Sequence, residues 1–127
     1  MRIEELKPRE AITVEPSESL LEAAKHLADD DIGALIVFSS RGPVGVFSER
    51  DLARAVADEV DVTFAQVGDY MTESPITVDL RSGLGDAIAK MNDFGVRHVV
   101  VTDENDVVGM VSMRDLVALL GTVWPEL

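Results

Sequence analysis

One stretch of the chain decides the fold, because it occurs twice. It reads VGVFSERDL at residues 44–52 and VGMVSMRDL at residues 108–116. Working outward from it, residues 12–52 align with residues 76–116 without a gap. The identical pairs include Ile12-Thr13-Val14 with Ile76-Thr77-Val78, Leu20 with Leu84, Ala23 with Ala87, and Ser48, Arg50, Asp51 and Leu52 with Ser112, Arg114, Asp115 and Leu116. Self-similarity of this kind indicates one structural unit used twice.

Both copies predict the same order of elements. A short β-type run is followed by a helix with apolar residues at i, i+3, i+4 and i+7, which are Leu20, Ala23, Ala24 and Leu27, then Leu84, Ala87, Ile88 and Met91. Ser19 with Glu22 predicts a capping box that starts the first helix near residue 19. Two β-rich runs joined by a turn come next. A second helix follows, with Leu52, Ala55 and Val56, or Leu116, Leu119 and Leu120, at core spacing.

This order predicts an α/β (α+β) protein of two pseudo-twofold-related β-α-β-β-α units packed through their sheets. One unit of about 55–60 residues has a marginal core, so the two are expected to form one compact module. We assign residues 1–60 to the first repeat and residues 61–127 to the second. The linker, residues 58–69, is acidic and favours a short helical turn around residues 63–67.

The composition excludes several classes of protein. With 24 acidic and 11 basic residues the net charge is −13, which disfavours nucleic acid and membrane as partners. Salt screens that field over about 8–10 Å, so a small anionic ligand stays compatible with it. The chain has no cysteine, and its N-terminus and apolar runs resemble neither a signal peptide nor a membrane span. We expect a soluble, cytoplasmic protein.

The repeated motifs resemble a tandem pair of CBS domains, the regulatory module known from cystathionine β-synthase. The residues that carry the resemblance are YMT at 70–72 before PITV at 75–78, GVRHVVVTD at 95–103, VGMVSMRDL at 108–116, and IGALIV at 32–37 with VGVFSERDL at 44–52. The resemblance covers nearly the whole chain. It implies a stand-alone Bateman module that binds an adenine nucleotide (AMP, ADP or ATP) or S-adenosylmethionine in clefts between its repeats.

The resemblance also assigns site residues. It implies one site formed by Val46, Ser48 and Asp51 with Thr72, Thr77, Val96, Arg97 and His98. The pseudo-symmetric site comprises Met110, Ser112 and Asp115 with Thr13, Ile32, Gly33 and Ala34.

The chemistry of these residues agrees with such a site. Asp51 and Asp115 fall in the first turn of a helix, where a carboxylate satisfies free N–H groups and can also accept hydrogen bonds from a ribose diol. Ser48 and Ser112 lie where a hydroxyl and backbone N–H groups can meet a phosphate. The alternative is that both Ser–Asp pairs serve only as helix caps.

Arg97 and His98 form a small phosphate-binding pair, whereas the first repeat has Gly33 and Ala34 at these positions. We expect phosphate to be held mainly there, with help from Arg50 or Arg114. The alternatives are a surface ion pair for Arg97 and a partly buried histidine for His98.

Neither a metal site nor an active site is predicted. The acidic runs at residues 29–31 and 103–106 lack the spacing of a calcium loop and are interpreted as solvated turns. The two histidines have no convincing nucleophile beside them, so the chain is not expected to be an enzyme or to require a cofactor. We predict a regulatory, energy-sensing homodimer that acts in trans on an unidentified protein. The alternative is a ligand-free dimerisation module.

Overall fold

A computed structural model describes residues 1–124 of the chain. Its contacts divide the chain into two compact units. The first unit is Ile12–Pro75, and the second combines Met1–Ala11 with the chain from Ile76 onward. The predicted division of the sequence into repeats at residues 1–60 and 61–127 stays a prediction. In the packing of the structure, the N-terminal segment belongs with the second repeat.

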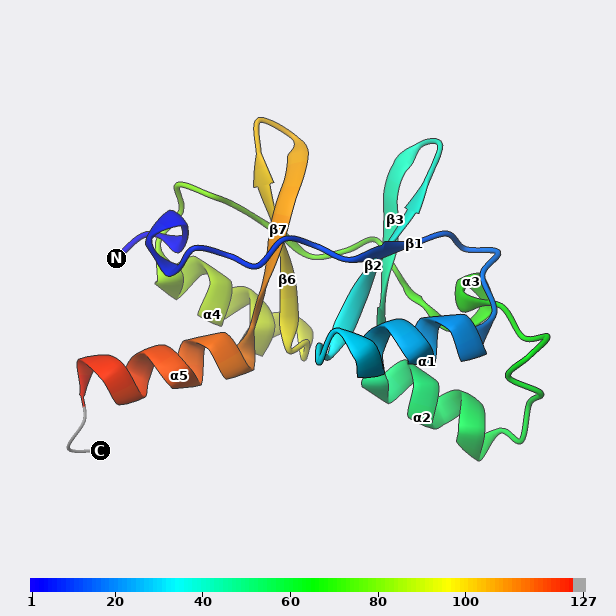
Figure 1. The fold of residues 1–127 in the computed structure, drawn as a ribbon. Helices are drawn as coiled ribbons and strands as arrows, with labels where there is room; N and C mark the ends of the chain where they lie inside the picture. Colours follow the sequence, from blue (N-terminus) through cyan, green and yellow to red (C-terminus); the bar gives the residue numbers. More distant parts are fainter. Residues whose placement is uncertain (125–127) are drawn as a thin grey trace. The chain divides into compact units, whose positions relative to one another are not determined.

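The first unit contains a four-stranded sheet in the order β1-β2-β3-β4. Strand β1 runs parallel to β2, and β2, β3 and β4 pair antiparallel. Helices α1 and α2 contact each other below the strands (Figure 1). The elements are β1 (Thr13–Val14), α1 (Leu20–Asp29), β2 (Ala34–Ser39), β3 (Gly42–Ser48), α2 (Glu49–Ala57), α3 (Val67–Tyr70) and β4 (Thr72–Glu73).

The second unit has a three-stranded sheet in the order β5-β6-β7, which repeats the topology of β1-β2-β3: β5 is parallel to β6, and β6 is antiparallel to β7. Its elements are the 3-10 helix η1 (Ile3–Leu6), β5 (Thr77–Asp79), α4 (Leu84–Phe94), β6 (His98–Asp103), β7 (Asp106–Ser112) and α5 (Met113–Val123). Even the irregularities correspond, since the register shifts between Val37 and Phe38 and between Val101 and Thr102. The predicted β-α-β-β-α order is confirmed in both units.

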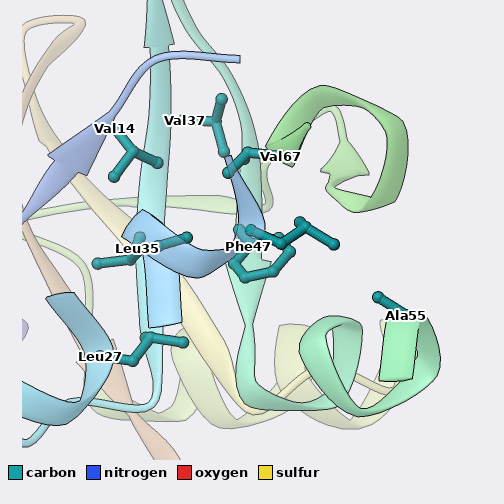
Figure 2. Packing of buried hydrophobic residues seen from close by; sticks show 9 residues of the cluster. Val14, Leu27, Leu35, Val37, Phe47, Ala55 and Val67 are labelled. Atoms are coloured by element: carbon teal, nitrogen blue, oxygen red, sulfur yellow. The ribbon is translucent and has the colours of Figure 1, made fainter. Parts of the chain in front are cut away.

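Each unit has its own apolar core. In the first, side chains from both long strands and from all three helices meet (Figure 2), among them Val14, Leu27, Leu35, Val37, Phe47, Ala55 and Val67. The second core contains Ile3, Val78, Ala87, Met91, Val99, Val101, Val111 and Leu116. Full burial of one such large side chain stabilises the fold by about 1.5–3 kcal/mol. The core residues therefore come from the predicted strands and helices and also from two segments outside them, which hold Ile3 and Val67.

The predicted helix starts are confirmed, but three predicted core positions are wrong. Helix α1 begins at Leu20, and the Ser19 hydroxyl accepts the Glu22 N–H at 3.2 Å, which is one half of the predicted capping box; the Glu22 carboxylate faces Lys25 instead. Val56, Ile88 and Leu120 are largely exposed. Each helix meets its sheet along a narrow strip, and these side chains lie on the margin of the apolar stripe, beyond that strip.

The segments that precede each repeat occupy equivalent places. Val67 of α3 is fully buried in the first core, and Ile3 of η1 is fully buried in the second. The short helix lies at Val67–Tyr70, later in the linker than the turn expected around residues 63–67. The core of each unit is therefore completed by the segment that precedes the first strand of the other repeat.

Candidate functional site

Ser48 and Asp51 form a reciprocal cap at the start of α2. The Asp51 N–H donates to the Ser48 hydroxyl at 3.4 Å, and Asp51 Oδ2 accepts the Ser48 N–H at 2.8 Å and its hydroxyl at 3.1 Å. The other carboxylate oxygen, Oδ1, faces Arg54 Nη1 at 3.3 Å. The Asp51 side chain is only 3% exposed. Both oxygens of this carboxylate are therefore already engaged within the first unit.

Ser112 and Asp115 form the matching cap at the start of α5. The Asp115 N–H donates to the Ser112 hydroxyl at 3.1 Å, and Asp115 Oδ2 accepts the Ser112 N–H at 2.8 Å. Oδ1 faces Arg9 Nε at 4.0 Å, which is longer than a hydrogen bond. The Asp115 side chain is 26% exposed. Among the described residues, Oδ1 of this partly exposed carboxylate therefore has no hydrogen-bond donor.

The start of the second strand lies beside the cap of its own repeat. In the first unit, Ala34 pairs with Ser48 and the Gly33 carbonyl accepts the Glu49 N–H at 3.0 Å. In the second, His98 pairs with Ser112 and the Arg97 carbonyl accepts the Met113 N–H at 2.8 Å. The sequence-based assignment joins each cap to the strand start of the other repeat, and that pairing across repeats stays a prediction.

The other assigned residues lie on the same strands and turns. Val46 of β3 pairs with Thr72 of β4, and Met110 of β7 pairs with Arg9. Thr13 lies on β1 with its side chain exposed, whereas the equivalent Thr77 on β5 is partly buried and its carbonyl accepts a hydrogen bond from Lys90. Ile32 and Val96 close the turns after the first helix of each repeat, and their N–H groups donate to Leu27 and Met91 respectively.

Arg9 is a candidate site residue that the sequence did not indicate. It precedes the aligned part of the repeats, and its charge gave no sign of proximity to Asp115. A signal was nevertheless present in the sequence. Arg9 precedes the first strand of the first repeat by a few residues, as Thr72 precedes that of the second repeat.

A hollow of about 300 Å³ lies between α1 and α2. Its lining is Ala24, Leu27, Ala28, Asp31, Ile32, Glu49 and Leu52. The only charged groups in it are two carboxylates, so it does not fit an anion. Within residues 1–124 no group of three His, Cys, Asp or Glu side chains is placed to hold a metal ion. None of the helices in that range is long and apolar enough to cross a bilayer.

Comparison with known proteins identifies the family. The CBS domain model matches residues 3–58 and 67–122, and the chain belongs to the CBS domain family. Its fold is that of a CBS domain pair. A CBS domain protein from Pyrobaculum aerophilum complexed with AMP, PAE2072, is 32% identical with a TM-score of 0.84, covering 96% of this chain and 99% of that one.

A second solved structure is the CBS domain pair of protein MJ0100 in complex with 5′-methylthioadenosine and S-adenosyl-L-methionine. It is 26% identical with a TM-score of 0.87, covering 97% of this chain and 98% of that one. Two CBS domain proteins similar to this chain have therefore been solved with adenosine-containing ligands.

Two of the curated relatives come from archaea and are uncharacterised. An uncharacterised 17.7 kDa protein of Acidianus ambivalens is 30% identical, covering 94% of this chain and 73% of its own length. The uncharacterised MK0525 of Methanopyrus kandleri is 30% identical over 88% of this chain, which spans 59% of that protein. Several relatives are thus considerably longer than this chain.

Proposed function

We propose that this chain is a non-catalytic regulatory module that binds an adenosine-containing ligand at its Ser–Asp caps. The observation that carries the proposal is Asp115, because it holds Ser112 through one oxygen and presents the other at a partly exposed position. A ribose diol donates two hydroxyl hydrogens, and a carboxylate oxygen is the acceptor that such a diol requires. The AMP complex of PAE2072 and the 5′-methylthioadenosine complex of MJ0100 support this class of ligand.

The two caps support unequal roles. Asp51 is nearly buried and has hydrogen bonds on both oxygens, so a ligand there must displace Arg54. Asp115 needs no such exchange, since its Oδ1 has only the distant Arg9 contact. We therefore assign the first ligand to the Asp115 cap. The Asp51 cap serves mainly to start α2, as the alternative interpretation of the sequence held.

We also propose that the chain forms a homodimer through α5. Met113, Val117, Leu120 and Trp124 lie at i, i+4, i+7 and i+11 and are all exposed. After Asp115 the described part of α5 carries no charged side chain. A chain of charge −13 repels its own copies, so an uncharged face is the surface on which two copies can meet about a twofold axis.

This face also favours the second candidate function, a dimerisation module without a ligand. Titration with AMP, ATP, S-adenosylmethionine and 5′-methylthioadenosine, followed by calorimetry and thermal unfolding, distinguishes the two. At a ligand concentration 100-fold above Kd the gain in stability is about 2.7 kcal/mol. Absence of binding at millimolar concentration, with a dimer in light scattering, would establish the second function instead. The regulated partner and the cytoplasmic location stay predictions.

A further inference from the structure

The segment before the first strand of one repeat packs against a glycine of the other repeat, and this glycine has the same position in both. A Cβ on Gly45 would lie 2.6 Å from the Thr72 carbonyl oxygen, and a Cβ on Gly109 would lie 2.6 Å from that of Arg9. Glycine allows this close backbone approach. Thr72 then pairs with Val46, and Arg9 pairs with Met110. Arg9 thus stands in the second repeat where Thr72 stands in the first.

This correspondence indicates that Arg9 belongs to the ligand site of the second repeat. Thr72 is one of the residues that the family resemblance places in the ligand site of the first repeat. The site built on Asp115 lacks the phosphate-binding pair Arg97 and His98, since Gly33 and Ala34 stand at these positions, and Arg50 or Arg114 was expected only to help. Arg9 supplies a positive charge from the N-terminal segment.

The two caps also differ in the part of the chain that supplies the neighbouring arginine. In the first repeat it is Arg54, one turn along α2 from Asp51. The equivalent position of α5 is Ala118, so α5 offers no such partner. Arg9 is 61% exposed and contacts Asp115 only at 4.0 Å, which leaves the donors of its guanidinium available.

We propose that Arg9 is a ligand-binding residue of the Asp115 site that selects ligands with an anionic 5′ group, such as a nucleoside phosphate, over uncharged nucleosides. This rests on the proposed function. A ribose hydroxyl on Asp115 Oδ1 replaces a contact that is longer than a hydrogen bond. The guanidinium then binds phosphate through two parallel N–H donors, which is the geometry that arginine provides.

The test compares AMP with 5′-methylthioadenosine, whose 5′ group is uncharged, by isothermal titration calorimetry. We expect Arg9→Gln to weaken AMP binding at one site about tenfold, the loss of one charge-assisted contact, and to leave 5′-methylthioadenosine within about twofold. Arg41→Gln is the matched control, because this exposed arginine in the β2–β3 turn makes the same change in net charge. It should change neither affinity.

Equal weakening of both ligands by Arg9→Gln, or no weakening, would overturn the assignment of Arg9 alone. The same loss of AMP in Arg41→Gln would do so too, because the effect would then belong to the general field. If the wild-type protein binds neither ligand, the proposed function fails and the assignment with it. Thermal unfolding verifies that the variant is folded; should it not be, Arg9→Lys keeps the charge without the paired donors and is expected to weaken AMP by a smaller factor.

Discussion

The two repeats share a backbone and differ in how their caps and helix faces are used. Helix α2 begins with a carboxylate that is nearly buried and held by its own helix, while α5 begins with a carboxylate that is partly open beside Arg9. The exposed side of α5 carries Met113, Val117 and Leu120, whereas α2 has Glu49, Ala53 and Val56 at these positions. After duplication, one repeat can thus keep a motif for structure while the other keeps it available for binding.

The largest effect is expected where the N-terminal segment enters the second core. Ile3→Ala should lower the free energy of unfolding by about 2–5 kcal/mol, because a fully buried side chain leaves a cavity. Urea denaturation measures this. Glu10→Ala, at an exposed position of the same segment, is the control and should change stability by less than about 0.5 kcal/mol. If both substitutions change the free energy of unfolding by the same small amount, the N-terminal segment does not contribute to the core of the second unit.

The next effect concerns the helix faces. Leu120→Glu should weaken dimerisation by about 2 kcal/mol or more, roughly thirtyfold, because a twofold axis places a carboxylate from each copy in the apolar contact. Val56→Glu is the matched change on α2 and should have little effect. Sedimentation equilibrium measures both. If the two substitutions act alike, the difference between the faces has no role in assembly.

The two caps are expected to differ in what their loss affects. Removing Asp51 should lower stability more, and removing Asp115 should lower ligand affinity more. Asp51→Ala should cost about 1–2 kcal/mol of stability, since it leaves the Ser48 N–H without its acceptor. Asp115→Ala should cost less stability but weaken the adenosine ligand about tenfold. Urea denaturation and calorimetry on both variants measure the pair. Equal losses of affinity would mean that both caps bind ligand.

The smallest effect is expected at Arg54. Its side chain is largely exposed, so Arg54→Ala should lower stability by only about 0.3–0.5 kcal/mol, typical of an ion pair within one helix. By freeing Asp51 Oδ1 it should also make the first cap resemble the second and raise the number of ligands bound. Calorimetric stoichiometry tests this. An unchanged stoichiometry would show that Arg54 does not keep the first cap closed.

The site was predicted only in part, and the reason is physical. Ser48, Asp51, Ser112 and Asp115 were found because a cap is a local device, made by residues three apart. Their difference in accessibility was not found, since it depends on which distant side chain reaches the second carboxylate oxygen. Arg9 lies more than a hundred residues from Asp115 in the sequence, and nothing in its neighbourhood indicates that contact.

The sequence by itself determined the duplication, the order of strands and helices, the family and the two caps. The duplication, the order of elements and the caps follow from identities and periodicities within short stretches of chain, and the family follows from the resemblance of the repeated motifs. The tertiary structure decided that Ile3 completes the second core, that Val56, Ile88 and Leu120 stay exposed, and that Arg9 stands beside Asp115. These features depend on long-range packing, in which the sheet fixes the strip of each helix that is covered and the backbone fixes which segment flanks each strand.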